Sequence, residues 1–234
     1  MNWRDYWNGD SSIYVNDRHR RLHYKRVAND LLCLKEELFG DRRPEMLDYG
    51  CGEAIEADRI AKACARLVLA ETAPRVVESL SDRFGNNADI EVVVADSLLP
   101  GDSHRFDLIV VNSVIQYVQL PALRAMLADW RKLLRPAGKL VVADVIPRGA
   151  RAAVDAAALL RFGWKGGFFF AALGGLVRTA LSDYRKLRGT LGIAQYDEAE
   201  FLDILRKAGY TATRRAHNLG HNPTRMCFVA EPSG

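Results

Sequence analysis

The amino-acid sequence predicts an α/β protein built on a doubly wound, mostly parallel sheet of seven strands. From residue 46 onward, short apolar runs alternate with stretches of helical periodicity, and each run leads into turn or polar residues. Repeated strand–helix units make the strands parallel and bring ligand-binding groups to their carboxyl ends. The 234 residues are 49% hydrophobic and 26% charged, a composition that fits one globular domain over 1–234 and excludes disordered and fibrous classes.

The first predicted element is a helix over 17–38, which ends at Gly40. Further helices are expected over 54–64, 73–84 and 120–134, and the last of these is followed by the stop signal Arg-Pro-Ala-Gly at 135–138. The five apolar runs that read as strands lie at 46–49, 66–70, 90–95, 108–112 and 140–145.

After Val145 the alternation stops, and it resumes only with a helix over 197–208 and two β-rich runs at 211–216 and 226–230. We interpret the intervening 148–192 as a helical cap inserted after strand five. The segment 1–40 is interpreted as an N-terminal helical lid over the cofactor. Trp3, Tyr6 and Trp7 would either close this lid or serve only in ordinary packing.

The net charge of +4 is modest, but it is unevenly placed, because 151–190 contains seven basic and two acidic residues. This charge distribution does not predict a nucleic-acid partner. The four cysteines form no CxxC pair, the N-terminus has no apolar signal core, and the longest uncharged apolar run, 166–177, is shorter than the about 20 residues that span a bilayer. A cytoplasmic protein with reduced thiols is expected.

A glycine-containing segment, LDYGCGEA at 47–54, lies where the first strand gives way to the first helix. Glycines there allow backbone N–H groups to approach a ligand closely. The GxGxxG dinucleotide fingerprint is excluded because Ile55 occupies its third glycine position. Glu71, nineteen residues after Gly52, ends the second strand, where it can accept both hydroxyls of a ribose. Asp96 ends the third strand, where a carboxylate can accept an adenine amino hydrogen.

This series resembles the class I S-adenosylmethionine-dependent methyltransferases. The loop LDYGCGEA, the acid after strand two, Asp96-Ser97, FDLIVVNSVIQYV and LLRPAGKLVVAD follow the family's order and spacing over 45–147 and 197–230. The resemblance implies a Rossmann-like methyltransferase fold and S-adenosylmethionine as cofactor, with S-adenosylhomocysteine as product. One departure is that Ala54 replaces the third glycine of the loop.

Carried over by position, the resemblance implies that Asp48 orients the methionine amino group, and it implies no metal. Glu71 would hold the ribose, and Asp96 with Ser97 the adenine. For Asp48 and Glu71 the alternative role is helix capping or a surface carboxylate, and for Asp96 it is a turn. The implied cofactor-binding residues are Asp48, Gly50, Cys51, Gly52, Glu71, Thr72, Asp96, Ser97, Asn112 and Ser113.

Methyl transfer from a sulfonium depends mainly on in-line approach and exclusion of water, so a general base is optional. If the acceptor is a hydroxyl, a base helps. The candidate catalytic residues are His19, His23, Tyr117, His217 and His221. The alternatives are a solvated helix face for the first two histidines, a solvated turn for the last two, and packing for Tyr117.

Nucleobase amino methyltransferases of this fold usually have an Asn-Pro-Pro-aromatic turn after strand four, but Asn112 is followed by Ser113-Val114-Ile115. This argues against DNA bases as acceptors, and we expect a small organic molecule instead. The cap combines apolar bulk with basic charge, which suits an apolar or amphipathic acceptor. The predicted acceptor-binding residues are Gln116, Arg161, Phe168, Phe169, Phe170 and Arg225, with Lys165 as an alternative to Arg161 at the pocket mouth.

Other readings of the cap stay open at this point. Its apolar residues would equally bury its own helices, form a dimer contact, or rest on an anionic membrane surface through 160–180. A non-catalytic module whose cap binds a partner, and a methyltransferase acting on RNA or protein, are the rival functions. The oligomeric state is not predicted.

Overall fold

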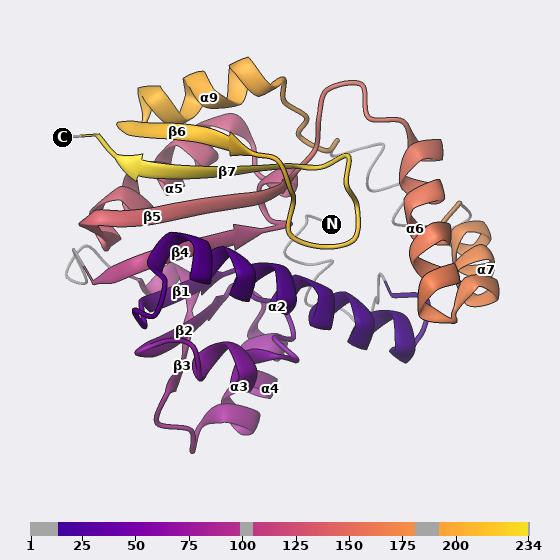
Figure 1. Cartoon of the computed structure of the whole chain (residues 1–234), viewed down its shortest axis with the longest axis horizontal. Coiled ribbons are helices and arrows are strands. Elements are labelled where there is room, and N and C mark those ends of the chain that lie inside the picture. Colours follow the sequence, from indigo (N-terminus) through magenta and orange to yellow (C-terminus); the bar gives the residue numbers. More distant parts are fainter. Residues whose placement is uncertain (1–13, 99–104, 181–191, 234) are drawn as a thin grey trace.

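The structure is a computed structural model that describes residues 14–98, 105–180 and 192–233. Its centre is one sheet of seven strands in the order β3-β2-β1-β4-β5-β7-β6 (Figure 1). The first five strands are parallel, whereas β7 runs antiparallel to both β5 and β6. The predicted sheet is therefore confirmed. The strands are β1 (Glu45–Tyr49), β2 (Arg66–Glu71), β3 (Ile90–Val94), β4 (Phe106–Asn112), β5 (Leu134–Val145), β6 (Tyr210–Arg215) and β7 (Met226–Pro232).

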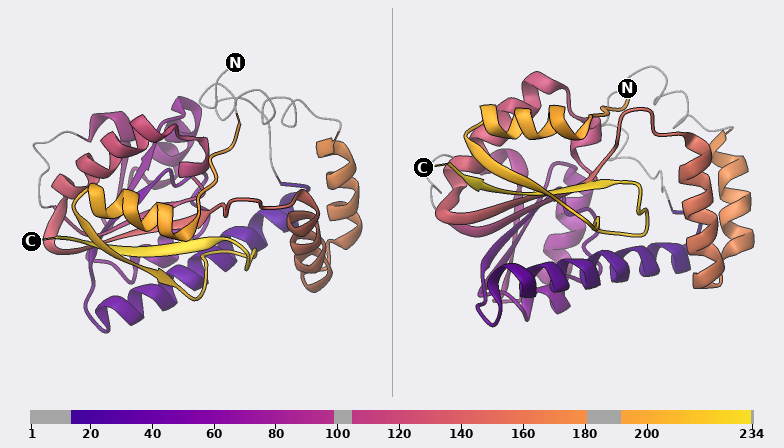
Figure 2. Two further views of the ribbon diagram at one scale, coloured as in Figure 1. Left: turned by 90° about the horizontal axis from the view of Figure 1, so that it is seen from above. Right: turned by 45° about the horizontal axis from the view of Figure 1, so that its top comes forward.

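Helices cover both faces of the sheet, as the doubly wound prediction requires (Figure 2). On one face, residues of α2 (Asp17–Phe39), α3 (Ala57–Ala61) and α4 (Pro74–Phe84) share a buried core. On the other face, α5 (Leu120–Leu133) and α9 (Glu198–Lys207) share a second core with the sheet. The strand order reverses between β1 and β4. Open α/β sheets bind ligands at such a switch point, outside the carboxyl ends of the strands, and we refer to this place as the crevice.

Two expected boundaries differ from the structure. The helix predicted over 54–64 is reduced to α3, because Ala54 has a φ of 42° and residues 50–56 form turns. The stop signal at 135–138 does end α5 at Leu133, but the same residues belong to β5, which follows without a separate loop. A register shift between β4 and β5 at Phe106 accommodates them.

The long helix α2 belongs to two parts of the molecule. Ala28, Leu31 and Leu34 in its second half are buried against the sheet layer. Its first half extends beyond the carboxyl edge of the sheet towards the cap (Figures 1 and 2). Trp3, Tyr6 and Trp7, the other residues predicted for the lid, lie outside the described residues.

The cap contains a helical hairpin, α6 (Ala152–Gly166) and α7 (Phe169–Ala180), which lies beyond the carboxyl edge (Figure 1). Gly167 reverses the chain between the two helices with a φ of 71°, in the left-handed region that favours glycine. Pro147 bridges Tyr196, and the Arg148 N–H donates to the Tyr196 carbonyl at 3.0 Å. The inserted segment therefore leaves and rejoins the sheet at one point.

None of the helices in the described ranges combines the length and the apolar character needed to cross a bilayer.

Candidate active site

The glycine loop, residues 50–54, follows β1 and turns sharply at the crevice. Gly50 and Gly52 have φ values of 73° and 57°, so both use the region that L side chains rarely adopt. A Cβ on Gly50 would lie 2.4 Å from Val114 Cγ2, and one on Gly52 would lie 2.9 Å from the Tyr24 hydroxyl. Ala54 takes a positive φ as well, the conformation that the missing third glycine would adopt freely.

Glu71 holds the loop from the end of β2. One carboxylate oxygen accepts from the Gly52 N–H at 3.0 Å, and the other accepts from the N–H groups of Thr72 at 2.6 Å and Ala73 at 3.2 Å. Ala73 is the N-cap residue of α4, and no side-chain hydrogen bond from the described residues caps this helix. An ionised carboxylate has about four lone-pair sites, and it can still receive hydroxyl donors.

The first half of α2 also holds the loop. The Tyr24 hydroxyl accepts from the Glu53 N–H at 2.9 Å, and Arg20 pairs with the Glu53 carboxylate at 2.9 Å. From the other side, the Arg83 guanidinium donates to the carbonyls of Glu53 and Ala54. The segment predicted as a lid therefore contacts the backbone of the glycine loop directly.

Asp48, two residues before Gly50, is half-buried beneath the loop. Burial, and secondarily the neighbouring carboxylate of Glu71, raises the pKa of Asp48 to about 7. No hydrogen bond to its side chain occurs among the residues that the structure describes. The carboxyl group is thus available to a cationic ligand.

Cys51 is buried in the loop, and burial raises the pKa of its thiol well above the usual value. The predicted adenine residues Asp96 and Ser97 form a short 3-10 turn after β3, where both are exposed. The Ser97 hydroxyl donates to the Val94 carbonyl at 2.7 Å. Their contact with adenine stays a prediction.

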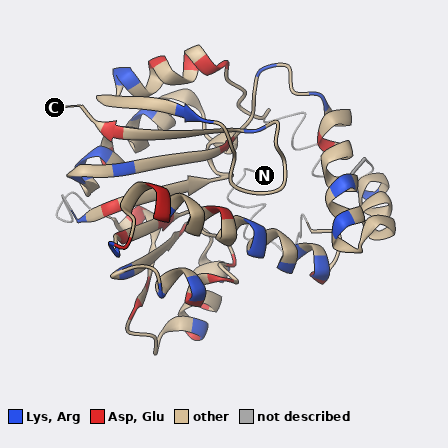
Figure 3. Ribbon diagram, viewed as in Figure 1, with Lys and Arg blue, Asp and Glu red and all other residues tan. Residues whose placement is uncertain are grey.

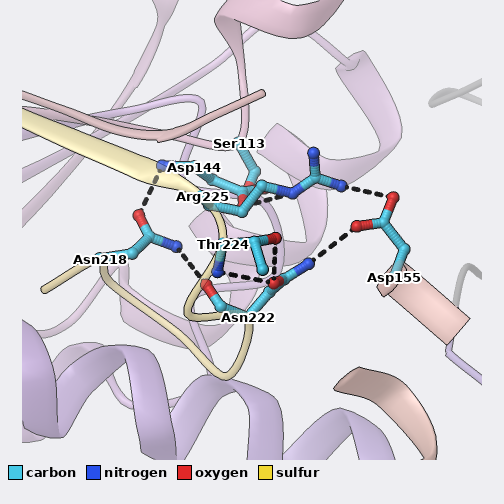
Figure 4. A network of polar contacts seen from close by, with 7 residues as sticks. All are labelled: Ser113, Asp144, Asp155, Asn218, Asn222, Thr224 and Arg225. Carbon is cyan, nitrogen blue, oxygen red and sulfur yellow. Dashed lines mark hydrogen bonds and ion pairs between the residues drawn. The ribbon is translucent and has the colours of Figure 1, made fainter. Parts of the chain in front are cut away.

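A polar network lies at the ends of β4 and β5, next to the glycine loop (Figure 4). Ser113 and Asp144 both have a φ of 59°, and the Ser113 hydroxyl donates to Asp144 at 2.8 Å. Arg225 lies 3.6 Å from Asp144 and 2.9 Å from Asp155 of α6. Burial raises the pKa of Asp144, and the Arg225 guanidinium opposes that shift. This network ties the sheet edge to the cap.

Two asparagines from the loop between β6 and β7 complete the network. Asn218 accepts from the Asp144 N–H at 2.9 Å, and the Asn222 amide donates to Asp155 at 3.0 Å (Figure 4). Of these residues, sequence reasoning selected Ser113 and Arg225 and placed the loop with Asn218 and Asn222 near the acceptor, but it missed Asp144 and Asp155. Asp144 could have been found from the sequence, because it is an acidic residue near the end of β5, just as Glu71 is an acidic residue at the end of β2.

A histidine cluster joins α2, α6, the start of α7 and the loop between β6 and β7. We define it as His19, His23, His221, Phe162 and Phe168. The His19 ring stacks on Phe168 at 5.0 Å, the His221 ring stacks on Phe162 at 4.7 Å, and His23 lies 6.5 and 6.1 Å from His19 and His221. Three of the five predicted catalytic residues are therefore brought together.

The other two predicted catalytic residues lie elsewhere. His217 is exposed although it is only four residues from His221, so it does not join the cluster. Tyr117 is half-buried in the short turn η3 (Ile115–Tyr117) after β4.

The imidazoles of the cluster are held in the neutral form. Burial, and secondarily the charge of His221, lowers the pKa of His19 to about 4 and that of His23 to about 3, and burial also lowers the pKa of His221. The Val15 N–H donates to His19 Nδ1 at 3.3 Å, which places the His19 proton on Nε2. His19 therefore presents a donor, whereas the neutral rings of His23 and His221 can each accept a proton.

Five buried polar atoms have no hydrogen-bond partner within the described part of the chain; one is Arg20 Nε on α2, and the other four belong to residues predicted for the site. These four are His19 Nε2, Asn112 Oδ1, Gln116 Oε1 and Arg225 Nη1. Such atoms are uncommon in folded proteins, because each unmet group costs about 1–3 kcal/mol. Two of the four are donors and two are acceptors, so together they can pair with a polar ligand.

The predicted acceptor residues of the cap divide between its two faces. Phe168 is buried in the histidine cluster, and Phe169 is half-buried against Trp164. Phe170, unlike Phe168, is 86% exposed on α7, and that one of these three phenylalanines lines an acceptor pocket stays a prediction. Successive helical residues turn by about 100°, which separates neighbours in this way. Arg161 and Lys165 are exposed on α6.

The fold and the glycine loop define a ligand-binding α/β protein of the doubly wound type, and comparisons with known proteins agree. Residues 47–142 match the family model described as "Methyltransferase domain". The chain is 14% identical to magnesium protoporphyrin IX methyltransferase from Synechocystis, whose structure was solved with S-adenosylmethionine bound. The TM-score is 0.62, and the match covers 98% of this chain and 95% of that one.

Two curated proteins are similar to this chain in sequence. Nodulation protein S of Sinorhizobium fredii is 25% identical over 148 residues, which is 63% of each chain. A ubiquinone biosynthesis O-methyltransferase of Maricaulis maris is 26% identical over 149 residues, or 60% of this chain and 57% of that protein. The matches thus span less than two thirds of both relatives. Over 47–142 the chain matches a methyltransferase family model, which agrees with the resemblance seen in the sequence, and the solved structures share its fold.

Proposed function

We propose that this protein transfers the methyl group of S-adenosylmethionine to a small organic acceptor at the carboxyl edge of its sheet. The observation that carries the proposal is the unpartnered Asp48 carboxyl beneath a glycine loop that leaves no room for side chains at Gly50 and Gly52. An ammonium group beside Asp48 would favour its ionised form, which burial alone opposes. The methionine end of the cofactor supplies such a group.

The rest of the cofactor would follow the ends of β2, β3 and β4. Glu71 with Thr72 would receive the ribose hydroxyls, Asp96 with Ser97 the adenine, and Asn112 with Ser113 would flank the sulfonium. The methionine moiety would lie against the backbone of the glycine loop, whose own N–H groups donate to Ala70, Glu71, Tyr24 and Cys51 within the protein. When bound, the cofactor supplies an activated methyl group, and the residues of this chain orient it and keep water away.

The acceptor would lie between the polar network and the histidine cluster. Arg225 Nη1 and His19 Nε2 are buried donors without partners, so an acceptor molecule that presents oxygen atoms to both suits the site. His23 and His221 are the candidate bases, because both rings are neutral at pH 7, although a pKa lowered to about 3 makes His23 a weak base.

A small acceptor is also supported by what the similar proteins are named for, since ubiquinone intermediates and protoporphyrin are small organic molecules. Within the domain 1–234 we assign 148–192 to the acceptor cap and 1–40 to the lid. The cytoplasm remains the proposed compartment, because all four cysteines are free thiols.

Calorimetry with the purified chain tests the cofactor site. S-adenosylmethionine or S-adenosylhomocysteine should bind in the micromolar range, and NAD should not bind comparably. Glu71→Ala should weaken binding by about 1.5–3 kcal/mol, because charge-assisted hydrogen bonds are lost. Glu78→Ala, an exposed position on α4, is the matched control and should leave the affinity unchanged. A preference for NAD would refute the proposal.

Turnover distinguishes the enzyme from a non-catalytic module. Incubation with methyl-labelled cofactor and a panel of phenols, amines and carboxylic acids should yield labelled small molecules. Label recovered only in RNA or protein would assign the activity to a macromolecular acceptor instead. Cofactor binding without any labelled product across the panel would favour the non-catalytic module.

A further inference from the structure

The second helix of the cap presents two different faces. Phe168 at its start, Ala172 and Gly175 are buried. The opposite face consists of Phe170, Leu173 and Val177, which are exposed and recur at positions i, i+3 and i+7. One face of this helix packs against the protein, and the apolar residues of its other face are free to contact a partner or a lipid.

The exposed apolar surface continues onto the end of α6. The Trp164 ring, 75% exposed, contacts Phe169 at 5.7 Å, and Phe169 contacts Phe170 at 5.7 Å. Among the described residues, all but one of the exposed large apolar side chains lie on this hairpin. The exception is Val94 on β3, and the others are Val154, Trp164, Phe170, Leu173 and Val177. Concentration of this kind marks an interaction surface.

Basic residues lie on the same hairpin and next to it. Arg161 and Lys165 are exposed on α6, and Arg18 at the start of α2 donates to the Gly166 carbonyl. Figure 3 shows the basic positions on α6 and at the start of α2. Residues 156–178 include no acid, and Asp155 is already paired with Arg225. The surface is therefore cationic as well as apolar.

We propose that the α6–α7 hairpin docks onto the surface of a bilayer that contains anionic phospholipids. Trp164 and Phe170 would enter the boundary between headgroups and acyl chains, where aromatic side chains are favoured. Arg161 and Lys165 would lie among the phosphates. A second copy of the chain suits this face less well, because a symmetric contact would bring these basic residues against their own copies. The proposal does not depend on methyl transfer.

Sedimentation with extruded vesicles tests the proposal. The full chain should bind vesicles of phosphatidylcholine and phosphatidylglycerol at 3:1, bind pure phosphatidylcholine weakly, and lose binding as salt rises. Phe170→Ser should lower the partition constant by about tenfold, because its ring no longer enters the interface. Val94→Ser, which changes an exposed apolar residue far from the hairpin, should leave it unchanged.

Two double variants that remove the same charge distinguish binding through the hairpin from general attraction between a basic protein and anionic vesicles. Arg161→Ala with Lys165→Ala should lower binding to the anionic vesicles by about tenfold. Arg206→Ala with Lys207→Ala removes the same charge from α9 and should have little effect. Equal losses in the two double variants, or no binding to anionic vesicles at low salt, would overturn the proposal. So would a dimer that Phe170→Ser dissociates, because the face would then belong to a second copy.

Discussion

The glycine loop and the histidine cluster lie on two sides of one crevice, yet they are held together differently. The loop is fixed by hydrogen bonds to its backbone, from Glu71, Tyr24 and Arg83. The cluster is fixed by ring packing between α2, α6, the start of α7 and the loop that carries His221. The hydrogen bonds engage backbone groups of the loop and therefore do not depend on the loop's own side chains, whereas ring packing changes with each side chain of the cluster.

The difference indicates how specificity is divided between the two sides. On the cofactor side, the donors of the loop and the Glu71 oxygens already have defined partners. On the acceptor side, His19 Nε2 and Arg225 Nη1 are buried without partners. Under the proposed function, discrimination between acceptors would therefore rest on buried groups that only the correct ligand satisfies.

The largest expected effect tests whether Arg225 is a structural part of the acceptor side. Arg225→Met should lower the free energy of unfolding by about 3 kcal/mol, because the largely buried Asp144 and Asp155 lose their counter-charge. Urea denaturation measures the change. Arg214→Met, which removes an exposed pair with Glu198, should cost at most about 1 kcal/mol. Equal effects would show that the network is not stabilising, and Asp144→Asn should partly restore the Arg225→Met variant.

On the cofactor side, Gly50→Ala should destabilise the fold by about 2 kcal/mol and abolish measurable cofactor binding. The new Cβ would occupy a left-handed conformation 2.4 Å from Val114 Cγ2. Gly174→Ala is the control, because a Cβ there meets nothing within 4 Å and alanine favours the helix. Denaturation and calorimetry together measure both effects, and unimpaired binding by Gly50→Ala would contradict the close approach of the loop.

The histidine cluster should make stability depend on pH. The pKa of His19 is about 4 in the folded protein against 6.5 ordinarily, so between these values the unfolded chain binds more protons. The stabilisation is complete above pH 6.5 and is lost as the pH falls towards 4, by about 2 kcal/mol at pH 5 for His19. Unfolding measured between pH 5 and 7 should show a shallower slope in His19→Phe. An unchanged slope would mean that His19 is protonated in the folded protein.

The smallest effect is expected outside both regions. Phe170→Ser should change the free energy of unfolding by less than about 0.5 kcal/mol, because its ring is exposed. Thermal unfolding checks this, and a clear loss of stability would show that the outer face of α7 is covered by the protein itself.

The loop side could be predicted from the sequence because its signals are local. Strand, glycines and the acid of the next strand follow one another at short range, and the sheet that they predicted is confirmed. Asp144 was missed although it occupies an equivalent position near the end of β5. The residues that bind the cofactor are still predictions.

The acceptor side could not be predicted in the same way, because its partners are far apart in the sequence. Asp155 meets Asn222 and Arg225 across 67 and 70 residues, and no periodicity encodes those distances. His217 and His221 looked equivalent in the sequence. The Gly220 N–H donates to Asp30 on α2 at 2.9 Å, which fixes the neighbouring His221 against that helix and leaves His217 outside.

The bridge between Pro147 and Tyr196 has a consequence for the evolution of this protein. Because the two ends of the insertion are already in contact, the entropy of closing a chain between them grows only slowly with its length. Segments of other lengths and sequences can therefore be exchanged at this point with little cost to the sheet. Such exchange would change the acceptor and the surface on which the protein works, while the older cofactor crevice is inherited intact.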